Sequence, residues 1–132
     1  MRYYTDYQIS WDYELDDYID KKYIITINKI LKEIKKEIKN PIVKNIVVTP
    51  ILLKENQLGV YCYGTKQYIG IDVGNVVQAC DEYKINYYRG IKTTILHEIF
   101  HAMQDSKGKE LNEIDAEDFA LDFVDYGTAN TI

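Results

Sequence analysis

Cysteine and proline are scarce in this 132-residue chain, which contains two of each. Cys62 and Cys80 form no CxxC pair, and two cysteines are too few for the disulfide framework of a domain this size. We therefore expect two reduced thiols that fill semi-buried positions. The low proline content, with 46% hydrophobic and 28% charged residues, excludes the composition of a disordered or collagen-like chain. The sequence predicts a soluble globular protein.

Long hydrophobic runs and an excess of positive charge are also absent. Apolar runs such as residues 46–48 and 51–53 are far shorter than the roughly 18 residues of a membrane span. The acidic, Tyr-rich N-terminus lacks the basic and apolar regions of a signal peptide, so we expect a cytoplasmic protein with no membrane contact. With 16 Lys and Arg against 21 Asp and Glu, the net charge of -5 argues against nucleic acid as the main partner.

The length predicts a single domain, residues 1–132. Within it, residues 1–17 carry Trp11, four tyrosines and five acidic side chains but show no helical or alternating period. We expect an irregular N-terminal arm there. Its aromatic side chains either pack onto the main body or lie over an active-site cleft, and the sequence leaves both readings open.

The rest of the chain alternates between helical and extended patterns. Apolar residues at helical spacing predict an amphipathic helix over about 18–39, ended by Asn40-Pro41. Three β-rich stretches follow, at 46–53, 58–63 and 67–73, and the last two are expected to form a hairpin. Residues 74–86 are expected to form a turn and a short helix. Two further helices are expected at about 88–105 and about 111–126. The pattern predicts an α+β domain, with a small, mostly antiparallel three-stranded sheet that packs one face on helices.

The only two histidines, His97 and His101, frame an HExxH motif. Side chains at i and i+4 lie on one face of a helix, so both imidazoles can reach one tetrahedral Zn²⁺ while Glu98 projects beside them. Gly90 and Thr94 fall on the same face one and two turns earlier, which predicts an approach to the metal lined by small residues. The opposite side of the helix carries an isoleucine stripe expected in the core, Ile91, Ile95 and Ile99.

An open zinc site needs a third protein ligand. The chain has no third histidine, and Gln104 and Lys107 stand where the metzincin extension requires Gly and His. The ligand is therefore a carboxylate or, less readily, a cysteine. Glu113 and Glu117 lie one turn apart on a face whose small Ala116 and Ala120 permit close approach. The acidic side chains on and before this helix are Glu110, Glu113, Asp115, Glu117 and Asp118.

The segments 97–102 (HEIFHA) and 112–120 (NEIDAEDFA) resemble the gluzincin arrangement, HExxH followed by NExxA. They are most similar to the compact ImmA/IrrE-type zinc metallopeptidases, and the resemblance covers roughly residues 67–124. It implies a minimal zincin-like domain with an HExxH active-site helix and a C-terminal helix bearing Glu113 as the third zinc ligand. Glu117 replaces the Asp or Asn that commonly orients a zinc-bound histidine, and Phe100 replaces the usual Gly. No helix-turn-helix segment is evident.

The resemblance implies a zinc metalloendopeptidase with one Zn²⁺ per chain, acting on a specific intracellular protein and associated with a phage or mobile element. Zinc held by two histidines and Glu113 would lower the pKa of its bound water toward about 7, with Glu98 as the general base. Such a site also needs a donor for the oxyanion, and Tyr87, Tyr88 and Tyr126 are the tyrosines nearest the motif helices. The resemblance further suggests that strand 67–73 presents its edge to an extended peptide substrate.

Two other functions fit the same residues. One is a non-catalytic binding or inhibitor protein of a phage or mobile element that keeps the zincin scaffold, which would be indifferent to replacement of Glu98 by Gln. The other is a purely structural zinc site, in which Cys62 or Cys80 completes a closed set of four ligands. Alkylation of both thiols without zinc loss would exclude this last reading.

Overall fold

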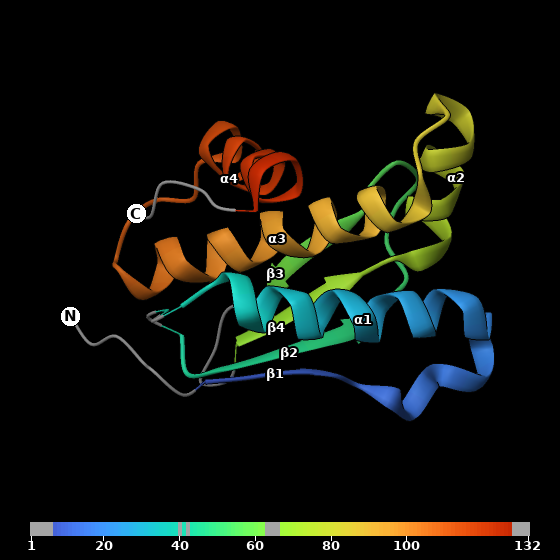
Figure 1. Cartoon of the computed structure of the whole chain (residues 1–132), viewed down its shortest axis with the longest axis horizontal. Helices are drawn as coiled ribbons and strands as arrows, with labels where there is room; N and C mark the ends of the chain where they lie inside the picture. Colours follow the sequence, from blue (N-terminus) through green and yellow to red (C-terminus); the bar gives the residue numbers. More distant parts are fainter. Residues whose placement is uncertain (1–6, 40, 42, 63–66, 128–132) are drawn as a thin grey trace.

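The computed structural model describes residues 7–39, 41, 43–62 and 67–127, and Figure 1 shows their arrangement. In chain order the elements are strand β1 (Gln8–Trp11), the 3-10 helix η1 (Tyr13–Tyr18), helix α1 (Lys21–Glu37), strands β2 (Asn45–Pro50), β3 (Gly59–Cys62) and β4 (Gln67–Ile71), and helices α2 (Val73–Tyr83), α3 (Tyr87–Ser106) and α4 (Glu113–Tyr126). Among them, no helix has the length and apolar character that crossing a membrane requires.

The sheet is mixed, with strand order β1-β2-β4-β3. β2 pairs in parallel with both β1 and β4, whereas β3 and β4 pair antiparallel. The expectation of three mostly antiparallel strands is therefore wrong in strand number and in direction, although the predicted pairing of the last two strands is confirmed. The connection explains the direction: a helix between β1 and β2 is long enough for a parallel crossover. The predicted hairpin turn at 64–66 lies outside the described residues.

The described part of the N-terminal arm is ordered rather than irregular. Tyr7 and Trp11 are only 3% and 7% exposed, and the Trp11 indole Nε1 donates a hydrogen bond of 2.6 Å to Asp16 Oδ1 in η1. Asp12 joins this segment to the sheet, because its carboxylate accepts from the Thr49 hydroxyl at 3.1 Å. Residues 7–17 thus pack onto the body at the sheet edge opposite β3; residues 1–6 of the predicted arm lie outside the described residues.

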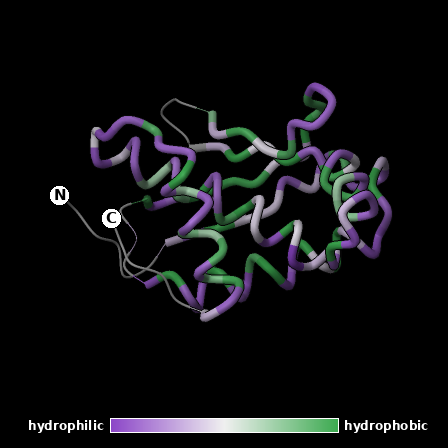
Figure 2. Tube along the Cα trace, turned by 90° about the horizontal axis from the view of Figure 1, so that it is seen from above, coloured by the Kyte–Doolittle hydropathy of each residue, from purple (hydrophilic) through white to green (hydrophobic). Residues whose placement is uncertain are grey.

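Helices α1 and α3 cover one face of the sheet, as the two views in Figures 1 and 2 show. The residues that face the sheet are apolar and fully buried, which confirms the amphipathic patterns of both helices; they are Ile27, Ile30 and Ile34 of α1 and Ile91, Ile95 and Ile99 of α3. Each such side chain contributes roughly 1.5–3 kcal/mol through burial. The opposite face of the sheet is less covered, since Val47, Val60 and Tyr68 keep intermediate exposure.

A buried polar cluster joins α1 and α3 side by side. The Lys92 ammonium, on a side chain only 4% exposed, donates to Glu37 Oε1 at 2.9 Å and to the Tyr88 hydroxyl at 3.2 Å. The Tyr88 hydroxyl in turn donates to Glu33 Oε2 at 2.7 Å. Because Lys92 is paired with Glu37 and has the Glu33 carboxylate 4.0 Å away, burial of its charge is tolerated, and these contacts join α3 to α1.

Helix α4 packs on the outer side of α3 (Figure 1). Its small residues Ala116 and Ala120 are fully buried, as the sequence predicted, so the two helix backbones approach closely. Phe100 of α3 packs against Phe119 of α4 with ring centroids 4.7 Å apart. Phe100 therefore anchors α3 to α4 through Phe119.

Candidate metal centre

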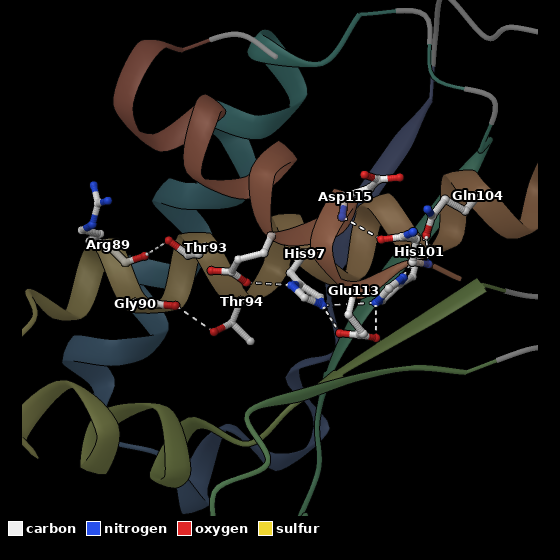
Figure 3. Close-up of polar contacts among 11 residues, drawn as sticks. Arg89, Gly90, Thr93, Thr94, His97, His101, Gln104, Glu113 and Asp115 are labelled. Atoms are coloured by element: carbon white, nitrogen blue, oxygen red, sulfur yellow. Dashed lines mark hydrogen bonds and ion pairs between the residues drawn. The ribbon is translucent and has the colours of Figure 1, made fainter. Parts of the chain in front are cut away.

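Three side chains from α3 and α4 converge through their polar atoms (Figure 3). His97 and His101 lie one turn apart, and their Nε2 atoms are 3.1 Å from each other. The Glu113 carboxylate spans both rings: Oε2 is 2.8 Å from His97 Nε2, and Oε1 is 2.8 Å from His101 Nε2. Glu113 is the first residue of α4, directly after the N-cap Asn112, so the start of this helix sets its position.

The outer nitrogen of each imidazole is engaged by an acceptor. Glu117 Oε2 lies 2.9 Å from His97 Nδ1, and Gln104 Oε1 lies 3.0 Å from His101 Nδ1. A carboxylate can only accept, so Nδ1 of His97 donates the hydrogen. Gln104 Oε1 also accepts from the Asn112 amide at 3.2 Å, which identifies that atom as the oxygen and assigns the Nδ1 hydrogen of His101 as well.

These tautomers decide what the centre can bind. In a neutral imidazole with its hydrogen on Nδ1, Nε2 carries the lone pair that can bind a metal, and both Nε2 atoms face the Glu113 carboxylate. A carboxylate this close to two ring nitrogens requires positive charge between them, either a hydrogen on a ring nitrogen or a metal ion. A tetrahedral zinc ion about 2.0–2.1 Å from its ligands holds the ligand atoms roughly 3.3 Å apart, close to the separations of 2.8 to 3.1 Å seen here. The donor set of two imidazoles and one carboxylate fits zinc with a fourth position open.

Glu98 lies beside the cluster and is only 7% exposed. One ligand atom from each of His97, Glu98 and His101 lies within 4.8 Å of the other two. Burial raises the pKa of the Glu98 carboxyl, and the two neighbouring histidines only partly offset this effect. For Glu113, burial also favours the protonated form, but the hydrogen bonds and charges of the two histidines outweigh it and lower the pKa of that carboxyl.

A cavity of about 420 Å³ opens on the centre. Its wall on the α3 side includes Gly90 and Thr94, as the sequence predicted, and its wall on the sheet side includes Gly59. A Cβ at Gly59 would lie 3.2 Å from Glu98 Cγ and 3.0 Å from Thr94 Cγ2, so a larger residue there would push against both side chains, and glycine suits this close approach of β3 to α3. The cavity provides room for a substrate directly beside Glu98.

The structure brings together five residues that the sequence singled out, namely His97, Glu98, His101, Glu113 and Glu117. The side chains of the other acidic candidates, Glu110, Asp115 and Asp118, make no contact with either histidine in the described part of the chain. Cys80 lies against Gly90, about 10 Å along α3 from His97, which leaves it outside the cluster. The described residues thus give no support to a closed site completed by Cys80.

The three tyrosines considered as oxyanion donors do not reach the cavity. Tyr88 faces α1, where its hydroxyl is bonded to Glu33. The Tyr87 hydroxyl donates to Asp81, and Tyr126 is 77% exposed near the end of α4. None of them lines the cavity beside Glu98, so nearness in sequence was a poor guide to this role.

Gln104 is the residue of the centre that the sequence reasoning missed. It is 4% exposed and accepts from both His101 Nδ1 and the Asn112 amide, so it orients one imidazole and fixes the chain next to Glu113. Its place three residues after His101 was a usable signal, because i and i+3 side chains are neighbours on a helix.

We expect replacement of Gln104 by Met to weaken zinc binding by about 10- to 100-fold, since the variant keeps the side-chain length but loses the acceptor for His101 Nδ1. Titration of the metal-free protein against a competing chelator measures the change. Gln104→Glu, which keeps an acceptor, is the matched control and should retain most of the affinity. Equal losses in both variants would show that Gln104 acts through packing alone.

Comparison of the chain with family models, with curated protein sequences and with solved structures found no match.

Proposed function

We propose that this protein is a zinc-dependent metallopeptidase that hydrolyses a peptide bond in a specific intracellular protein. The observation that supports it most strongly is the convergence of two imidazole nitrogens and one carboxylate, with the buried carboxylate of Glu98 beside them at a cavity. A structural zinc site would close all four positions with protein ligands, whereas this arrangement offers three and an adjacent base.

Each residue has a distinct part in the proposed reaction. His97, His101 and Glu113 would hold the ion, while Glu117 and Gln104 keep the two imidazoles in the tautomer that binds it. Zinc there would supply a coordinated water of lowered pKa and polarise the scissile carbonyl. Glu98 accepts the proton of the attacking water on its carboxylate and then passes it to the leaving amine.

The strand that contacts the substrate in this proposal is β3, not the strand at 67–73 that the sequence suggested. β4 is paired on both sides, with β2 and β3, so it has no edge to offer. The Asp72 amide donates to the Leu58 carbonyl at 2.9 Å, which makes these two residues a hydrogen-bonded pair. Because such pairs alternate along an antiparallel ladder, the main-chain groups of the next residue, Gly59, point away from β4 on the cavity side. They are placed to pair with an extended peptide.

Metal removal tests the proposal. Metal-free protein and protein reconstituted with one equivalent of zinc are each incubated with a mixture of intracellular proteins, and new peptide ends are identified by mass spectrometry. We expect new ends only with the zinc-loaded protein. One bound zinc per chain without any new end would favour the alternative of a non-catalytic binding protein, and a chain that binds no zinc would overturn both readings.

A further inference from the structure

The cavity beside the metal centre is lined by one cationic side chain, Arg89, within the described part of the chain. Arg89 precedes His97 by eight residues on α3, a distance of about 12 Å along the helix. Arg89, Thr93 and His97 recur at i, i+4 and i+8, so they line one face of the helix and follow the cavity wall (Figure 3). Arg89 and residues of the metal centre therefore line the same cavity.

The distance fits an extended peptide. At about 3.3 Å per residue, 12 Å corresponds to roughly three to four residues. A peptide whose scissile carbonyl lies at the metal centre and which runs along this wall would thus bring its third or fourth residue to Arg89. The lining of this cavity also includes the apolar side chains of Leu58, Ile85 and Leu121.

The two threonine hydroxyls that line this cavity already donate hydrogen bonds to carbonyl groups of α3. Thr93 Oγ1 donates to the Arg89 carbonyl at 2.6 Å, and Thr94 Oγ1 donates to the Gly90 carbonyl at 2.8 Å. Arg89 itself uses Nη1 to contact Asp125 Oδ1 at 2.6 Å, an ion pair whose side chains are 42% and 43% exposed. Exposed pairs of this kind contribute about 0–1 kcal/mol, so Asp125 is readily displaced, and the remaining guanidinium donors suit a second carboxylate.

We infer that Arg89 is a specificity-determining residue that binds a carboxylate of the substrate three to four residues from the scissile bond. This inference rests on the proposed peptidase function and names the substrate class: peptides with an acidic side chain, or a free C-terminus, at that distance. Arg89 is the one cationic side chain among the described residues that line this cavity, and it selects for such a group, because a neutral or basic side chain leaves the charge of Arg89 without a substrate partner.

The test is the cleavage profile of zinc-loaded protein on a mixture of proteome-derived peptides, half of them amidated at the C-terminus. Wild type is compared with Arg89→Gln, Arg89→Glu and the control Lys36→Glu, which makes the same charge reversal at an exposed position of α1. We expect wild type and the control to enrich Asp and Glu by about tenfold at the third or fourth position on one side of the cut. Arg89→Gln should lose this enrichment, and Arg89→Glu should enrich Lys and Arg at the same position.

The amidated half distinguishes the two sources of the carboxylate. If cleavage near chain ends disappears on amidation, the C-terminal carboxylate is the recognised group; if it persists, an acidic side chain is. Identical profiles for wild type and Arg89→Glu would overturn the inference while leaving the peptidase intact. Absence of cleavage by every zinc-loaded variant would instead overturn the peptidase proposal, and this inference with it.

Discussion

Replacement of Glu98 by Gln is expected to lower peptide cleavage by about 10²- to 10⁴-fold, the usual contribution of a positioned general base. The two side chains have nearly the same shape, so Gln fits the space that Glu98 occupies beside Gly59 and the fold is retained. What is lost is the carboxylate oxygen that accepts the proton of the attacking water. Rates are measured on any peptide that the zinc-loaded wild type cleaves, with the zinc content determined on the same samples.

The zinc content of that variant separates two roles for Glu98. The carboxylate lies close enough to both histidines to be a ligand itself, but the two oxygens of Glu113 already lie 2.8 Å from the Nε2 atoms. We therefore expect Glu98→Gln to hold as much zinc as wild type. The control is Glu110→Gln, the same change at an exposed residue before α4, which should alter neither quantity. A loss of zinc with Glu98→Gln would make Glu98 a ligand and remove the base from the mechanism.

The helices could be predicted from the sequence because their apolar residues repeat every three or four positions over long segments. The patterns of α1 and α3 correspond to side chains that are fully buried in the structure. β1 escaped prediction, since four residues are too few to show a period, and its place in the sheet depends on parallel pairing with β2, more than thirty residues later. Strand direction was misjudged for the same reason: it is set by a long-range crossover, which no local pattern encodes.

The candidate metal centre shows the same contrast between local patterns, which the sequence reveals, and long-range packing, which it does not. His97, Glu98 and His101 form a local motif whose spacing has direct meaning on a helix, so sequence alone grouped them. The position of Glu113 across from them depends on how α4 packs, through Phe100, Phe119 and the two buried alanines. The sequence pointed to the helix face that carries Glu113 and Glu117, and a family resemblance singled out Glu113. Tyr88 is the opposite case. It is close to the motif in sequence, but it lies on the face of α3 that points toward α1.

Zinc binding is expected to stabilise the fold, and replacement of Glu113 by Ala should remove that effect. Zinc at 100 times its Kd stabilises the wild type by about 2.7 kcal/mol, which raises the Tm by on the order of 10 °C for a domain of this size. If loss of one of three ligands weakens binding by at least about 100-fold, the same zinc concentration stabilises Glu113→Ala by no more than about 0.4 kcal/mol. Thermal unfolding with and without zinc measures both quantities.

The matched control is Glu110→Ala, which removes the same charge three residues earlier at an exposed position without a contact to either histidine in the described chain. Its Tm should rise with zinc as the wild-type Tm does. Glu110→Ala and Glu113→Ala change the net charge by the same amount. A difference between them therefore reflects the position of the Glu113 carboxylate between the two imidazoles. A zinc-dependent rise in Tm that persists in Glu113→Ala would show that the third ligand comes from elsewhere, and Glu98 is a carboxylate close enough to take that place.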